Sequence, residues 1–112
     1  MPEYTKSERA KLRELADEAY ERELGTHLAE LDKSFALWRR GKLVSSELSK
    51  EIHEFHQHAA RDVFSAYQLP HPAMIVARAI AFEILERREI PAGLLAKLKE
   101  EIAVFERVSG AA

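Results

Sequence analysis

Cysteine is absent from this chain. Its absence excludes disulfide bonds, thiolate zinc sites and thiol nucleophiles, and it is typical of proteins from a reducing compartment. No apolar run approaches the ~20 residues that a membrane-spanning helix needs, and the first residues, up to Lys6, lack an apolar signal region. We therefore expect a cytoplasmic protein that has no contact with a membrane.

An excess of charge of one sign is also lacking. The chain has 17 basic and 19 acidic residues, and its net charge is −2. One compact basic patch, Arg39-Arg40-Gly41-Lys42, follows Trp38, but basic residues in the last turn of a helix are expected because they interact favourably with its negative end. This balance does not favour binding to nucleic acid.

Glycine and proline are scarce, with four of each, and no stretch alternates apolar and polar residues as a half-buried strand would. The 112 residues, 46% of them apolar, suit a single domain over 1–112 that forms its core without metal or disulfide. We predict an all-α helical bundle of four helices in two antiparallel hairpins, with a long first helix. The helices are expected at about residues 6–40, 45–68, 72–88 and 91–108.

Local signals mark the expected helix ends. Thr5 and Glu8 form the pattern of a capping box at the start of the first helix. Gly41 is a suitable C-terminal stop for that helix. Pro72 and Pro91 are suited to the first turns of the third and fourth helices.

The first helix carries two apolar stripes rather than one. The early stripe runs from Leu12 to Ala19 and the later one from Tyr20 to Trp38, and Leu31 lies about 100° around the axis from Leu12. Either the helix bends near Gly25, or its two halves pack against different neighbours. We favour the second alternative, because glycine within a helix costs only about 1 kcal/mol and forces no break.

The third helix is apolar on nearly all sides. From Ala73 to Leu85 only Arg78 and Glu83 interrupt the apolar run, and a helix of this kind must be buried on nearly all sides. It lies either at the centre of the fold or in an interface with another chain, since large exposed apolar patches mark association sites. We predict a homodimer or another protein partner bound through Ile75, Ala79, Phe82 and Leu85.

Histidines cluster in the second helix, at positions 53, 56 and 58. With Ile52 at the centre of the buried stripe of this helix, helical rotation places His53 and His56 on one flank and His58 on the opposite border. A turn near residues 41–43 brings His27 opposite His56 or Gln57. Imidazole suits borderline metals, so His27, His53 and His56 form a hypothetical site for zinc, nickel or iron. The alternative is that these histidines make hydrogen bonds at the margin of the core.

No enzymatic constellation accompanies the histidines. The histidine spacing of zinc proteases and the Glu-x-x-His pattern of di-iron bundles are both missing, as are a glycine-rich phosphate loop and a nucleophile elbow. The residues therefore favour a non-enzymatic interaction or regulatory module that acts through helix–helix contacts. The alternative function is a metal- or ligand-binding bundle around His53 and His56.

Overall fold

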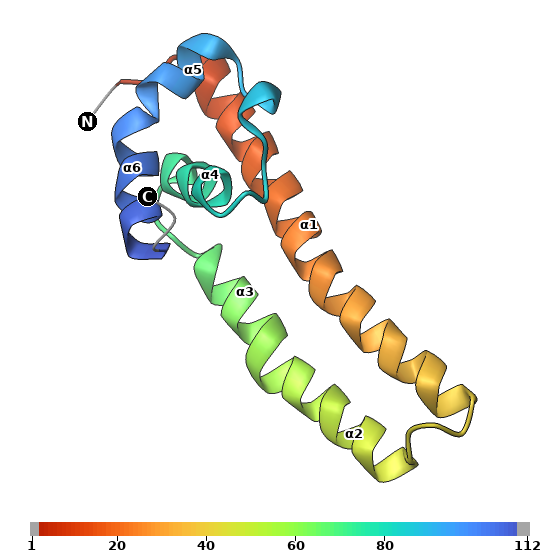
Figure 1. The fold of residues 1–112 in the computed structure, drawn as a ribbon. Helices are drawn as coiled ribbons and strands as arrows, with labels where there is room; N and C mark the ends of the chain where they lie inside the picture. Colours follow the sequence, from red (N-terminus) through yellow and green to blue (C-terminus); the bar gives the residue numbers. More distant parts are fainter. Residues whose placement is uncertain (1–2, 110–112) are drawn as a thin grey trace. The chain divides into compact units, whose positions relative to one another are not determined.

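A computed structural model describes residues 3–109 of the chain, and these residues contain helices and no strand. The all-α prediction is confirmed (Figure 1). In chain order the elements are α1 (Lys6–Arg39), α2 (Ser45–Glu54), the π-helical turn η1 (Phe55–Ala59), α3 (Ala60–Ala66), α4 (Pro72–Ala81), the 3₁₀ turn η2 (Arg87–Glu89), α5 (Ala92–Lys97) and α6 (Lys99–Ser109).

The chain divides into two compact units. The core unit comprises Met1–Ala19 and Tyr67–Ala112, and the hairpin comprises Tyr20–Ala66. Helix α1 belongs to both units and continues through Gly25 without a break. The prediction that the two halves of the first helix have different neighbours is therefore confirmed, because the early apolar stripe lies in the core unit and the later stripe in the hairpin.

Helix α4 lies at the centre of the core unit, beside α6 and the first part of α1 (Figure 1). Alanine makes up much of α4 and allows this close approach from several sides. The surrounding apolar side chains come from α1, the η2 region, α5 and α6 of the same chain. The buried cluster consists of Leu12, Leu15, Ala16, Ala19, Ala73, Ile75, Val76, Ala77, Ala79, Ile80, Ala81, Leu85, Ile90, Leu94, Leu98 and Ile102.

Helix α4 ends at Ala81, well before the predicted end at residue 88. Glu83 adopts a left-handed conformation with φ of 63°, and the N–H of Ile84 donates to the carbonyl of Ala79 at 2.8 Å. This closure turns Leu85 back into the core, where it is 1% exposed. No glycine marks the stop, so the usual signal for a helix end is missing.

The fourth predicted helix, 91–108, is interrupted at Leu98, so a continuous helix there is wrong. Leu98 has φ of −90° and ψ of −3°, and its N–H is shared between the carbonyls of Leu94 and Leu95 at 3.2 and 3.1 Å. The chain changes direction between α5 and α6 at this point (Figure 1). Leu94, Leu98 and Ile102 all remain at most 2% exposed, which shows that the interruption preserves core packing.

In the hairpin, the second part of α1 runs antiparallel to α2, η1 and α3 (Figure 1). Gly41, with φ of 73°, ends α1 as predicted, and the N–H groups of Gly41 and Lys42 close the last turn on the carbonyls of Trp38 and Leu37. The Oγ of Ser34 donates to Glu51 Oε1 at 2.7 Å, and Trp38 Nε1 donates to Ser45 Oγ at 3.0 Å. Both pairs fit the expected turn near residues 41–43.

Two glycines in this region are expected to respond oppositely to alanine. A Cβ would meet nothing within 4 Å at either Gly25 or Gly41, but only Gly41 has a positive φ. Gly25→Ala should raise the free energy of unfolding by about 0.5–1 kcal/mol, because alanine favours a helix interior. Gly41→Ala should lower it by about 1 kcal/mol through strain in the left-handed conformation. Urea unfolding followed by circular dichroism measures both, and changes of the same sign would contradict the assignment.

Candidate functional site

The histidine stretch coincides with the π-helical turn η1. The N–H of Ala60 donates to the carbonyl of Phe55, five residues earlier, instead of the four of an α-helix. Such turns are rare and recur at functional sites. His53, His56 and His58 are exposed, and His27 on α1 is half-buried.

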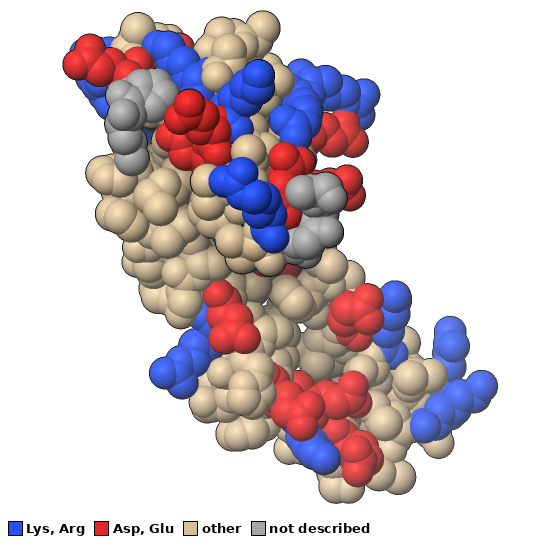
Figure 2. All heavy atoms as spheres, turned by 60° about the vertical axis from the view of Figure 1, so that its left-hand side comes forward, with Lys and Arg blue, Asp and Glu red and all other residues tan. Residues whose placement is uncertain are grey.

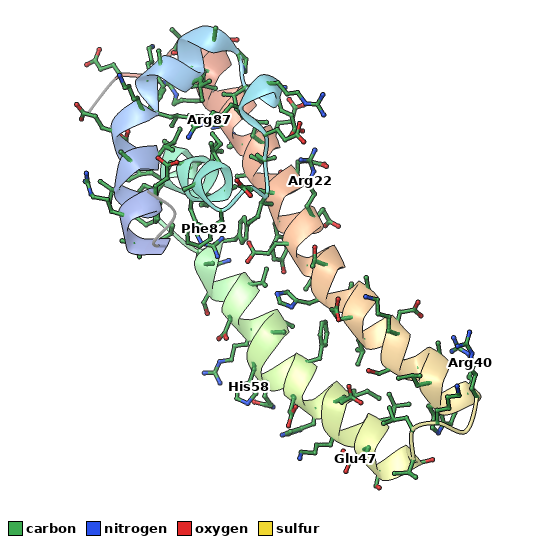
Figure 3. The ribbon with its side chains drawn as sticks, viewed as in Figure 1. Arg22, Arg40, Glu47, His58, Phe82 and Arg87 are labelled. Carbon is green, nitrogen blue, oxygen red and sulfur yellow. The ribbon has the colours of Figure 1, made fainter. Side chains whose placement is uncertain are left out.

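A shallow hollow of about 400 Å³ lies along one side of the hairpin. It receives His27 from α1 and His58 from η1, which is labelled in Figure 3. Carboxylates and a hydroxyl make up most of its polar lining. The other lining residues are Glu30, Leu31, Ser34, Glu51, Glu54, Phe55 and Ala59. The structure therefore brings His27 together with His58, whereas His53 and His56 do not line the hollow.

The hollow does not assemble a metal centre. Among residues 3–109, no group of three or more histidine, aspartate or glutamate side chains is arranged to hold a metal ion. Glu51 accepts the hydrogen bond from Ser34 across the hairpin, so part of the polar lining serves to join the two helices. Two of the three histidines in the hypothetical zinc, nickel or iron site, His53 and His56, lie outside this hollow.

The four residues of α4 and its C-terminal turn that were predicted to form an interface lie mostly inside the core unit. Ile75 is 7% exposed, Ala79 0% and Leu85 1%. Phe82, labelled in Figure 3, is 39% exposed, and the guanidinium of Arg78 lies 4.8 Å from its ring centroid. Because the chain itself covers α4, the apolarity of this helix does not require a second chain.

The hairpin, in contrast, leaves large apolar side chains in solvent. Only Leu48 and Val63 are buried among residues 20–66. Leu28 is 47% exposed, Ile52 40% and Phe64 54%. Sequence reasoning placed Ile52 at the centre of the buried stripe of the second helix, and its exposure corrects that assignment. Further exposed apolar residues lie near the hairpin tip, at Leu37, Trp38 and Val44.

Helical rotation, with the extra residue that the π turn inserts between Ile52 and Phe64, places Leu28, Ile52 and Phe64 on one face, which we call the exposed hairpin face. Each directly follows a residue that lines the hollow or is buried, and one step along a helix is a rotation of about 100°. The two helices of the hairpin are right-handed and run antiparallel. Moving one residue forward along either helix therefore rotates the side-chain position toward the same side of the hairpin. The exposed hairpin face therefore lies opposite the polar hollow. The preceding residues are His27, Glu51 and Val63.

A second polar cluster ties the start of the chain to α5 within the core unit. The predicted capping box is present: the N–H of Thr5 donates to Glu8 Oε1 at 2.9 Å, and the N–H of Glu8 donates to Thr5 Oγ1 at 3.0 Å. Lys97 Nζ donates to Glu8 Oε1 at 2.6 Å and to the carbonyl of Glu3 at 2.8 Å. Burial, followed by the nearby Glu101 and Glu8 carboxylates, raises the pKa of the Tyr4 phenol.

This cluster predicts a pH dependence of stability. The hydrogen bond from Lys97, followed by the one from the Thr5 backbone, lowers the pKa of Glu8 below its ordinary 4.5. A carboxyl whose pKa is lower in the folded state stabilises the fold above its ordinary pKa, and the contribution is lost as the pH falls through the lowered value. Glu8→Gln should therefore be less stable than wild type at pH 7, and the two should converge in acid. Urea unfolding across this range measures the difference, and a difference independent of pH would contradict the assignment.

Basic and acidic side chains are interspersed over the face of the molecule that Figure 2 shows. Among the described residues 3–109, no helix is long and apolar enough to cross a membrane. The basic residue Arg40 lies at the hairpin tip, where α1 has just ended (Figure 3).

Comparison with protein families, curated proteins and solved structures finds no match for this chain. No relative and no solved structure therefore indicates a function for this chain.

Proposed function

We propose that the protein is a non-enzymatic helical interaction module whose exposed hairpin face packs against the same face of a second copy. One observation carries the proposal: Leu28, Ile52 and Phe64 are 40–54% exposed on one side of a hairpin that buries only two residues. Large apolar side chains exposed on the same face favour protein association.

A second copy suits the hairpin for a geometric reason. Two antiparallel helices have only one neighbour each, and the four-helix bundle is the small arrangement in which every helix gains further neighbours. In a two-fold dimer the same face serves both copies. Rotation predicts that Asp32 borders the exposed hairpin face on α1, while His53 borders it on the other helix. A two-fold axis parallel to the helices would place this carboxylate against the partner's imidazole.

The apolar side chains are expected to contribute modestly to the free energy of dimer formation. Full burial of a large apolar side chain contributes about 1.5–3 kcal/mol, so a half-exposed side chain adds about 1 kcal/mol. Three side chains from each of two copies then contribute about 6 kcal/mol. Association itself costs about 4–15 kcal/mol, so the expected dimer is weak and depends on the polar contacts at the border of the face as well.

Sedimentation equilibrium over a range from micromolar to near-millimolar concentration tests the proposal. The mass should rise from that of the 12.8 kDa chain toward twice this value. The same series with a chelator should give the same result, which separates direct packing from a metal bridge between exposed histidines. A constant mass of one chain at all concentrations would contradict the proposal.

A further inference from the structure

A small cavity of about 180 Å³ lies in the core unit, between the first turns of α1 and the start of α4. Its apolar wall includes Leu12 and Ala73, which are 2% and 8% exposed. The complete lining consists of Tyr4, Arg9, Leu12, Arg13, His71, Pro72 and Ala73.

Apart from the Tyr4 phenol, the ionisable side chains that line this cavity are basic. The lining includes Arg9, Arg13 and His71 but no aspartate or glutamate, although acidic residues outnumber basic ones in the chain. The Nη1 of Arg9 donates to the carbonyl of Tyr4 at 2.6 Å, which fixes this guanidinium on another lining residue. The Arg13 side chain also lines the cavity; it is exposed and makes no hydrogen bond or ion pair with the described residues. A guanidinium without a partner beside an apolar cavity favours an anion.

The volume limits what the cavity can hold. Pockets for drug-sized molecules usually enclose about 300–1,000 Å³, so a ligand of that size would not fit. An apolar cavity of about 150 Å³, in contrast, accepts one benzene ring. The space in the core unit therefore matches a compact apolar body the size of a single aromatic ring.

We infer that this cavity binds a small monocarboxylate, with its apolar body against Leu12 and Ala73 and its carboxylate on the guanidinium of Arg13. Arginine pairs with a carboxylate through two parallel charge-assisted N–H donors, and a neutral ligand with a single acceptor oxygen makes a weaker contact. The site lies wholly within the core unit and is independent of the association through the hairpin.

The probe is benzoate, titrated into the ¹⁵N-labelled chain of 112 residues and followed by amide chemical shifts. Saturable shifts are expected at Leu12, Arg13 and Ala73, with a dissociation constant on the order of 1 mM, as suits so few non-hydrogen atoms. Benzamide has nearly the same shape without the charge and should bind at least about fivefold more weakly. This comparison uses the wild-type chain, so it does not depend on any variant folding.

Arg13→Gln should weaken benzoate binding at least about fivefold, since it removes the charge and the paired donors. Arg61→Gln is the matched control, because Arg61 is an exposed arginine of the hairpin, and it should leave binding unchanged. The inference is overturned by absence of saturable shifts at the cavity amides, by equal affinity for benzamide, or by equal effects of the two substitutions.

Discussion

Leu85→Ala is expected to lower the free energy of unfolding by about 2–5 kcal/mol, the range for truncating a buried leucine. Leu85 is 1% exposed and belongs to the buried cluster of the core unit. Truncation removes apolar contacts and leaves a cavity that rigid neighbours fill only in part. Because the contacts come from the same chain, the loss should be the same at every protein concentration. Urea unfolding at two concentrations a hundredfold apart measures it.

Phe82→Ala is the matched control, since both residues follow α4 and were predicted to meet a partner. Phe82 is 39% exposed, and its main specific contact is the guanidinium of Arg78, so its truncation should cost only about 1 kcal/mol. An unchanged unfolding free energy for Leu85→Ala, combined with weaker self-association, would restore the predicted interface on this segment. Equal large losses for both variants would contradict the burial difference between them.

Ile52→Glu is expected to raise the dissociation constant of the dimer at least about thirtyfold, which corresponds to 2 kcal/mol, the threshold for a residue central to an interface. The substitution places a carboxylate without a partner in the apolar contact, and burying such a charge is costly. Ile52 is 40% exposed in the single chain, so the fold should tolerate the change within about 0.5–1 kcal/mol. Leu28→Glu should act in the same way. Sedimentation equilibrium and far-UV circular dichroism measure the two effects separately.

Val104→Glu provides the control for this substitution. Val104 is 48% exposed on α6, in the core unit, so it matches Ile52 in chemistry and exposure but lies off the exposed hairpin face. It should leave the dissociation constant unchanged. Dissociation of the dimer by Val104→Glu, or a dimer unaffected by Ile52→Glu, would mean that the hairpin face is not where the copies meet.

The helix ends that depend on residues close in the sequence could be predicted. Thr5 and Glu8 satisfy each other's backbone N–H groups, and Gly41 takes up the left-handed conformation that favours glycine. The hairpin register followed from the position of this turn, as the Ser34–Glu51 hydrogen bond shows. These features depend on the chemistry of a few adjacent residues, which the amino-acid order displays directly.

The stop after α4 was not predictable, because long-range packing produces it. A residue with a side chain in the left-handed conformation costs about 1–2 kcal/mol, so Glu83 is an unexpected place for a helix to end. Burial of Leu85 contributes about 1.5–3 kcal/mol and offsets that strain. The interruption at Leu98 has the same character, since it keeps three apolar side chains in the core while the chain changes direction.

The candidate site was predicted in part. Sequence reasoning directed attention to the hairpin histidines, but it assumed a uniform rotation of 100° per residue along the second helix. The π turn at Phe55–Ala59 departs from that rotation, and His58 rather than His56 shares the hollow with His27. No residue type in this stretch signals a π turn.

By itself, the sequence determined that the protein is all-α, where α1 begins and ends, and how the hairpin is paired. Only the tertiary structure decided which apolar surfaces are covered. Hydrophobic periodicity identifies an apolar stripe because it depends on rotation about one helix axis, but it carries no information about what packs against that stripe. Helix α4, for which the centre of the fold and an interface were both open, is enclosed by its own chain, whereas Ile52, which was predicted to be buried, is 40% exposed.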